Sequence, residues 1–231
     1  MRLDKFLSNL KYGSRKEIRI MVKKGLVTIN GVTASSSDVQ IDPNYDKIFL
    51  NGEAVFYKEN ITLAFYKPVG YLSSHQSELY PTLFSLIEAP YHQFDLKIAG
   101  RLDYDSEGLV ILTTNGDLIH QITHPKKHVK KIYEATLDQP FTKMANDWLM
   151  AGIELKDEDG SIYQTSAIEL AYKDNIAIIT IDEGKFHQVK KMFAKVGFQV
   201  INLKRLQIGQ LKLDLKPGCY KEIEESDIFE R

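Results

Sequence analysis

Two Asn-Gly dipeptides constrain the start of the chain more than any other feature. Asn30-Gly31 follows an apolar run at residues 26–29, and Asn51-Gly52 follows another run at residues 47–50. An Asn-Gly pair readily adopts the positive φ angles of the tight turn that joins two antiparallel strands. The sequence therefore predicts a small sheet built from short hairpins in this region.

Two short helices are predicted ahead of the first hairpin. The first has the apolar spacing of one helix face, carried by Leu3, Phe6, Leu7 and Leu10. Ser14 with Glu17 three residues later forms a capping box, so the second helix should begin at Arg15. Gly25 suits the position just beyond a helix end. We expect two helices packed on the small sheet.

Positive charge is concentrated in these two helices, although the whole chain has a net charge of −1. Residues 1–24 contain eight Lys and Arg residues against Asp4 and Glu17 only. A solvated helix face is one interpretation of such a row. A surface that follows nucleic-acid phosphates is the other, because few acidic partners neutralise the row. The candidate contacts are Arg2, Lys5, Arg15, Lys16, Arg19, Lys23 and Lys24.

The order of these features resembles the S4 RNA-binding domain. The residues that carry the resemblance lie at 2–7, 14–17 and 24–31, and it covers about residues 1–50. It implies that the cations bind structured RNA, and by itself it implies no catalysis. We place an S4-like domain at residues 1–57, a short linker, and a second domain at residues 61–231.

Strands dominate the second domain. Strand-like runs recur at residues 62–66, 97–102, 108–114, 132–137, 176–181 and 199–203. Helices are predicted at residues 117–123 and 141–151, and before Gly197, where Val189, Met192, Phe193 and Val196 share one face. This irregular mixture predicts an α+β domain with a mixed, largely antiparallel sheet.

The composition favours a cytoplasmic protein without membrane contact. The single Cys219 cannot form an internal disulfide, and no stretch approaches the ~20 apolar residues of a spanning helix. Residues 1–5 lack the apolar stretch of a signal peptide.

Common catalytic and metal motifs are absent from the sequence. His120, His124 and His128 are spaced four apart, but Pro125 interrupts any helix that would align them. No phosphate-binding glycine loop, dinucleotide fingerprint or serine nucleophile elbow occurs. NTP hydrolysis, dinucleotide chemistry and acyl transfer are therefore disfavoured, and we expect no metal site.

An acidic loop at residues 100–109 lies between two strand-like runs. A polar connection whose side chains bind their own backbone is the simplest interpretation. A glycosidase with Asp103 and Asp105 as its carboxylate pair is another. We expect these two side chains to point to opposite sides of the loop, which makes such a pair hard to build around one bond.

Five motifs of the second domain resemble the RsuA-type pseudouridine synthases. In the order of the family they lie at residues 67–70, 100–109, 113–117, 131–133 and 183–192. Ser106 stands where the family often has Thr, and Lys191 where Arg is common. The resemblance implies a pseudouridine synthase fold with a catalytic cleft, and isomerisation of uridine to pseudouridine in RNA without a cofactor or metal.

The same resemblance assigns roles to individual residues. Asp103 matches the essential aspartate, Tyr133 the tyrosine that stacks on the target base, and Lys190 the basic residue that pairs with Asp103. Lys190 lies about 100° around the helix from Val189, so it can reach a cleft rather than the core. Arg101, in the same loop as Asp103, is a weaker candidate for contact with RNA.

The resemblance also implies a substrate and partners. The whole chain is most similar to the enzymes that act on 16S ribosomal RNA of the small subunit. The expected partner is this RNA, free or inside an assembling small subunit, and the protein is expected to be a monomer. A 23S ribosomal RNA enzyme of the same family is one alternative. A non-catalytic RNA-binding factor of ribosome assembly is the other.

Overall fold

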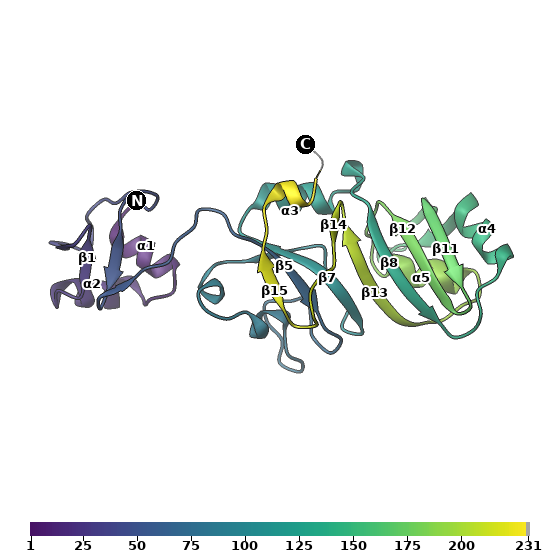
Figure 1. Ribbon diagram of the computed structural model, residues 1–231, viewed down its shortest axis with the longest axis horizontal. Helices are drawn as coiled ribbons and strands as arrows, with labels where there is room; N and C mark the ends of the chain where they lie inside the picture. Colours follow the sequence, from purple (N-terminus) through teal and green to yellow (C-terminus); the bar gives the residue numbers. More distant parts are fainter. Residues whose placement is uncertain (230–231) are drawn as a thin grey trace. The chain divides into compact units, whose positions relative to one another are not determined.

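The chain folds into two compact units in a computed structural model that describes residues 1–229 (Figure 1). The first unit contains Met1–Ile61 and Ile87–Leu96. The second unit contains Thr62–Leu86 and the chain from Lys97 onward. The last two residues of the predicted second domain lie outside the described residues.

The first unit has the predicted two helices and hairpin sheet. Its helices are α1 (Leu3–Asn9) and α2 (Arg15–Lys23), and its four-stranded sheet has the order β2-β1-β3-β4. The strands are β1 (Val27–Ile29), β2 (Val32–Thr33), β3 (Ile48–Leu50) and β4 (Glu53–Ala54). Asn30 and Asn51 both have a φ of 52°, so both predicted Asn-Gly hairpins are confirmed.

The predicted ends of α2 are also confirmed. Ser14 N donates to Glu17 Oε2 at 2.7 Å, and Glu17 N donates to Ser14 Oγ at 3.3 Å, which completes the capping box. At the other end Gly25, with a φ of 73°, donates to Val22 O at 2.9 Å. Glycine adopts this left-handed backbone without a side-chain clash.

The second unit is built on a large sheet with the strand order β11-β12-β8-β13-β7-β5-β15. Among the described pairings of this sheet, β7 with β13 is parallel and the others are antiparallel, as predicted. Its main strands are β5 (Thr62–Lys67), β7 (Ser106–Thr113), β8 (Lys131–Leu137), β11 (Glu169–Lys173), β12 (Ile176–Ile181), β13 (Val200–Ile208) and β15 (Tyr220–Glu222).

Shorter strands and helices complete this unit. β6 (Lys97–Ala99) pairs with β7, β14 (Leu211–Lys212) pairs with β13, and β9 (Ile153–Lys156) and β10 (Ile162–Thr165) form a separate hairpin. The helices are α3 (Gly116–Thr123), α4 (Lys143–Ala151) and α5 (Gln188–Lys195). Within residues 1–229, none of the helices has both the length and the apolar composition to cross a bilayer.

The parallel pair β7–β13 requires a glycine at position 108. Gly108 has a φ of 113°, and a Cβ at this position would lie 2.3 Å from Arg205 O. A side chain would therefore push the two strands apart. The close approach brings β13 against the start of β7, directly after the acidic loop.

Candidate active site

The acidic loop between β6 and β7 has a fixed backbone. The strand predicted at residues 97–102 ends earlier, because Gly100 turns the chain out of the sheet with a φ of 85°. Ser73 Oγ donates to Leu102 O at 2.6 Å and accepts from Leu102 N at 3.1 Å. Gly70 N donates to Tyr104 O at 2.9 Å. These bonds hold the backbone on both sides of Asp103.

Lys190 on α5 joins the two carboxylates of this loop. Its Nζ lies 3.0 Å from Asp103 Oδ2 and 2.6 Å from Asp105 Oδ1. Burial alone would lower the pKa of Lys190, but its hydrogen bonds to Asp105 and Asp103 outweigh that effect and raise it. The predicted pairing of Lys190 with Asp103 is present, and Lys190 remains charged there.

The expectation that Asp103 and Asp105 point to opposite sides is wrong. Alternate residues of an extended segment share one side, and here both carboxylates reach the same ammonium group. Burial acts to raise the pKa of Asp105, but the hydrogen bond from Lys190 prevails and lowers it. A glycosidase requires a carboxylic acid with a raised pKa, so Asp105 does not suit that role.

Tyr133 on β8 is held by a buried arginine of β13. Arg205 Nη1 donates to Tyr133 Oη at 3.3 Å, Nη2 to Gly100 O at 2.6 Å, and Nε to Leu109 O at 2.7 Å. The Arg205 side chain is 1% exposed and Tyr133 is 6% exposed. No local sequence signal indicated that Arg205 would be buried and hold Tyr133, because a cation beside Lys204 is usually a solvated one.

His187 is a second residue that the sequence analysis missed. It lies immediately before α5, and its Nε2 is 3.1 Å from Asp103 Oδ1. Its ring stacks on Phe186, with centroids 3.7 Å apart. The available signal was the position of His187 inside the fifth motif. A histidine in a sequence does not by itself indicate which side chain it will contact.

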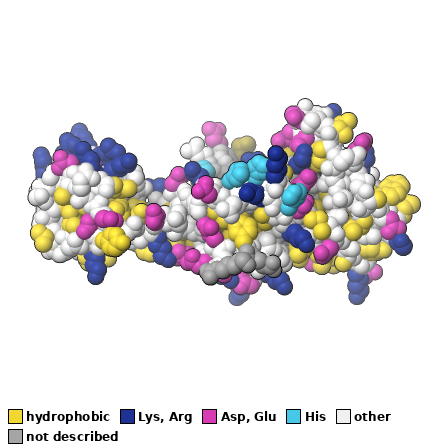
Figure 2. Space-filling model, turned by 90° about the horizontal axis from the view of Figure 1, so that it is seen from above, with side chains coloured by type: hydrophobic (Ala, Val, Ile, Leu, Met, Phe, Trp, Pro, Cys, Tyr) yellow, Lys and Arg dark blue, Asp and Glu magenta, His cyan; other side chains and the backbone are white. Residues whose placement is uncertain are grey.

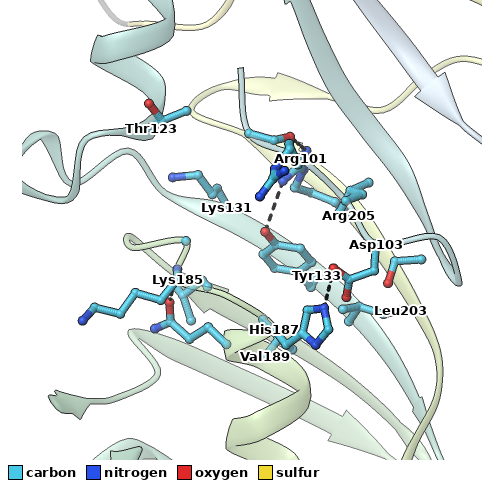
Figure 3. A pocket seen from close by; sticks show the side chains of 16 residues that line it. Arg101, Asp103, Thr123, Lys131, Tyr133, Lys185, His187, Val189, Leu203 and Arg205 are labelled. Atoms are coloured by element: carbon cyan, nitrogen blue, oxygen red, sulfur yellow. Dashed lines mark hydrogen bonds and ion pairs between the residues drawn. The ribbon is translucent and has the colours of Figure 1, made fainter. Parts of the chain in front are cut away.

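Four of these side chains, Asp103, Tyr133, His187 and Arg205, line one cavity of the second unit (Figure 3). In Figure 3 the ring of Tyr133 lies among the lining side chains, and dashed lines mark the contacts of Asp103 with His187 and of Tyr133 with Arg205. The lining includes Arg101, Asp103, Lys131, Tyr133, Lys185, His187 and Arg205. A wider groove of about 860 Å³ shares several of these residues, Arg101 and Asp103 among them.

Two further lysines lie buried beside this cavity. Lys67 Nζ donates to Ser106 O of the acidic loop at 2.6 Å and to Pro68 O at 2.9 Å. Lys131, which lines the cavity, donates to Val129 O at 2.9 Å. Burial lowers the pKa of each lysine to about 8. Both can therefore lose their charge near the neutral range, unlike Lys190.

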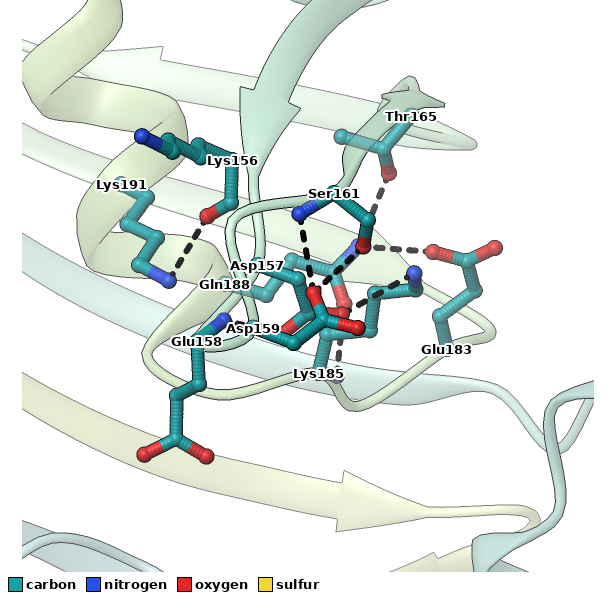
Figure 4. Close-up of polar contacts among 10 residues, drawn as sticks. All are labelled: Lys156, Asp157, Glu158, Asp159, Ser161, Thr165, Glu183, Lys185, Gln188 and Lys191. Atoms are coloured by element: carbon teal, nitrogen blue, oxygen red, sulfur yellow. Dashed lines mark hydrogen bonds and ion pairs between the residues drawn. The ribbon is translucent and has the colours of Figure 1, made fainter.

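The β9–β10 hairpin is tied to the segment before α5 (Figure 4). The buried Gln188 donates from Nε2 to Thr165 Oγ1 at 2.8 Å and to Glu183 Oε2 at 3.1 Å, and accepts from Lys185 N at 2.9 Å. Lys185 Nζ lies 3.2 Å from Asp157 Oδ2. The hairpin therefore supports the segment that carries His187.

The predicted RNA contacts of the first unit are at its surface. Figure 2 shows Lys and Arg side chains gathered on one side of this unit. Arg2 forms an ion pair with the buried Asp4 at 2.7 Å, so its guanidinium is held by the fold. The other six cations of the predicted row are exposed: Lys5, Arg15, Lys16, Arg19, Lys23 and Lys24.

The spaced histidines do not converge. α3 ends at Thr123, and the rings of His120 and His124 lie 4.6 Å apart, whereas His128 Nδ1 contacts Asp182 Oδ2 at 2.7 Å. Among the described residues, no group of three or more His, Cys, Asp or Glu side chains is arranged to hold a metal ion.

Comparison with known proteins identifies the class that this fold and site define. The model of the RNA pseudouridylate synthase family matches residues 61–195, and the S4 domain model matches residues 1–46. The chain therefore belongs to the RNA pseudouridine synthase family and carries an N-terminal S4 domain. Both resemblances seen in the sequence are confirmed.

Individual relatives place the chain among the RsuA-type enzymes. It is 40% identical to the Uncharacterized RNA pseudouridine synthase YtzG of Bacillus subtilis, over 99% of this chain and 97% of the relative. It is 36% identical to Ribosomal small subunit pseudouridine synthase A of Pasteurella multocida, over 99% and 98%. A crystal structure of a pseudouridylate synthase is similar with a TM-score of 0.66 and 34% identity, over 99% and 98%.

Proposed function

We propose that this enzyme isomerises one uridine of the 16S ribosomal RNA of the small subunit. The observation that carries the proposal is the Asp103 carboxylate, which lines the cavity with Tyr133 and is paired with Lys190. The choice of 16S rests on the relatives named Ribosomal small subunit pseudouridine synthase A, such as those of Pasteurella multocida and Vibrio vulnificus, at 36% and 34% identity.

The reaction needs no group from outside the substrate. The C1′–N1 bond of uridine breaks, a C1′–C5 bond forms, and one proton moves from C5 to N1. In our proposal Asp103 is the catalytic group that acts on the nucleotide, at its sugar or its base. The ammonium of Lys190 lies 3.0 Å from Asp103 Oδ2 and places a positive charge beside this carboxylate.

The target base must leave the folded RNA to reach Asp103. Extruding a stacked base costs a few kcal/mol. Stacking on an aromatic side chain such as Tyr133 returns about 1–3 kcal/mol. The hydrogen bond from Arg205 fixes the Tyr133 hydroxyl, and Arg101 lines the same cavity. The exposed cations of the S4 domain bind the phosphates of the surrounding RNA, which positions the substrate without reading its sequence.

Tritium release from RNA that contains 5-tritiated uridine tests the proposal. We expect release from 16S transcripts or small-subunit particles, and loss of release in Asp103→Asn with RNA binding retained. Asp105→Asn is the matched control, because Asp105 shares Lys190 but does not line the cavity around Tyr133; we expect it to retain most activity.

The outcomes separate the alternatives. Normal turnover of Asp103→Asn would refute the role of Asp103. Release from 23S transcripts alone would favour a large-subunit substrate, and tight RNA binding without release from any transcript would favour an assembly factor. Comparing naked 16S RNA with immature particles tests the assembling subunit as partner, and light scattering tests the proposed monomer. Fractionation of cells tests the cytoplasmic location.

A further inference from the structure

The geometry points to His187 as a positioning residue that fixes the orientation of the Asp103 carboxylate. The inference rests on the proposed function, in which this carboxylate acts on the extruded uridine. His187 Nε2 lies 3.1 Å from Asp103 Oδ1, and Lys190 Nζ lies 3.0 Å from Oδ2. Each oxygen of the carboxylate therefore has its own partner at the start of α5.

Lys190 alone does not fix the carboxylate. Its Nζ lies closer to Asp105 Oδ1, at 2.6 Å, than to Asp103 Oδ2, at 3.0 Å. A lysine ammonium is a compact charge on a flexible stem and imposes little direction on its acceptor. It supplies positive charge to both acids but leaves the Asp103 carboxylate free to rotate about its Cβ–Cγ bond.

The imidazole of His187 is planar and packs against a neighbouring ring, with the side chain 39% exposed. Its ring stacks on Phe186 with an interplanar angle of 20° and centroids 3.7 Å apart. Lys191 Nζ lies 5.1 Å from the centroid of the Phe186 ring and donates to Lys156 O on β9 at 3.0 Å. Stacked rings with a charged group held against them leave the imidazole few alternative orientations.

The backbone of His187 also adopts an energetically unfavourable conformation. Its φ is 52°, in the left-handed region, which a residue with a side chain adopts at a cost of about 1–3 kcal/mol. Such conformations concentrate at functional sites, where the surrounding structure maintains them. Here the hydrogen bonds of Gln188 and the first turn of α5 hold the backbone on either side.

The Asp103 carboxylate therefore faces the substrate in one defined orientation. With the imidazole Nε2 3.1 Å from Oδ1 and the Lys190 ammonium 3.0 Å from Oδ2, the carboxylate keeps a constant direction. Both Asp103 and His187 line the cavity, so this direction is set at its wall. Misplacement of a reacting group by about 1 Å can slow a reaction about 100-fold.

Two variants of His187 separate its polar contact with Asp103 from a general packing effect. His187→Phe keeps an aromatic ring that stacks on Phe186 but removes the nitrogen that contacts Asp103. His187→Gln removes the ring but keeps a polar nitrogen of similar reach. The difference between the two variants therefore reports the polar contact. Asparagine tolerates this backbone well, but its amide stops short of Asp103. His187→Asn therefore replaces His187→Phe if the Phe variant does not fold.

The measurement is the single-turnover rate constant of tritium release, together with the dissociation constant for the same RNA. We expect His187→Phe and His187→Asn to slow the reaction about 10- to 100-fold with RNA affinity unchanged, and His187→Gln to stay within about threefold of the wild type. Equal loss in all three variants, no loss in the Phe variant, or a loss of affinity alone would overturn the inference. Absence of release by the wild-type enzyme would instead contradict the proposed function.

Discussion

Arg205 connects three parts of the site through one side chain. Its guanidinium donates to Gly100 O at the start of the acidic loop, to Leu109 O on β7, and to the Tyr133 hydroxyl on β8. Arginine suits this task because its planar group presents several donors in fixed directions. The buried charge is thus surrounded by hydrogen-bond acceptors, which offsets part of the cost of its burial.

Replacing Arg205 by lysine should damage both stability and activity. One ammonium cannot reach all three acceptors, so at least one buried acceptor loses its partner, at about 1–3 kcal/mol. We expect a lower melting temperature by calorimetry and a slower tritium release, because Tyr133 and Gly100 are no longer held. Lys204→Gln on the same strand is the control. Its ammonium lies near the Tyr66 ring, 5.2 Å from the centroid, and not against Tyr133 or Gly100. A comparable loss in this variant would contradict the prediction.

At the scale of elements, the β9–β10 hairpin matters because it contacts the segment that carries His187. It belongs to none of the five family motifs, and the sequence analysis did not predict it. Its strands have only four residues each, and most of their side chains are at least partly exposed. Such short segments give a weak periodic signal. Its contacts with Gln188 and Lys185 nevertheless position the segment that carries His187.

Gln188→Leu should release this segment from the hairpin. The substitution leaves Thr165 Oγ1, Glu183 Oε2 and Lys185 N without their partner, and we expect a loss of about 1–3 kcal/mol in the free energy of unfolding. The rate of tritium release should fall by at least tenfold, because the approach of His187 and Lys190 to Asp103 depends on this segment.

Gln164→Leu is the matched control on the same hairpin. Gln164 is exposed and its Nε2 bonds only to Glu154 Oε1, at 3.0 Å. We expect unchanged activity in this variant. Equal rates for the two leucine variants, both measured under single-turnover conditions, would show that the hairpin does not position the segment that carries His187.

At the scale of the whole molecule, two separate stretches of the chain form the first unit. Ile87–Leu96 belongs to that unit, where Phe94 packs edge-on against Phe56 with ring centroids 5.8 Å apart, and Gln93 Nε2 donates to Phe56 O at 3.4 Å. Removing the S4 domain by truncation would therefore expose apolar residues of this segment. Substitution of charges is the cleaner way to test the role of the domain.

Neutralising the basic row of α2 should weaken RNA binding mainly at low salt. In the triple variant Arg15→Gln, Arg19→Gln and Lys23→Gln, we expect the slope of log affinity against log salt to fall by about 2, since each phosphate contact contributes about 0.7–0.9. Filter binding to 16S transcripts over a salt series measures the slope, while single-turnover chemistry at saturating enzyme should stay unchanged.

A charge-matched control uses exposed lysines of the second unit, Lys173, Lys212 and Lys216, each replaced by Gln. We expect a smaller change of slope in this variant. If both triple variants change the slope equally, the effect comes from net charge and the basic row makes no particular phosphate contact.

Local sequence signals determined the helix ends and the turns, because their contacts are short-range in the sequence. The capping box at Ser14, the helix end at Gly25 and the turns at Asn30 and Asn51 each depend on neighbours a few residues away, and all appear where they were predicted. The family motifs carried Asp103, Tyr133 and Lys190, and the structure brings all three to one part of the second unit.

Only the tertiary structure decided which distant groups meet. The contact of Lys190 with Asp105, the contact of His187 with Asp103, and the hydrogen bond of the buried Arg205 with Leu109 each join residues more than 80 positions apart. A polar side chain looks solvated in sequence until the packing of strands and helices removes its water. The hydrogen bonds that then replace water depend on that packing, so no local pattern contains them.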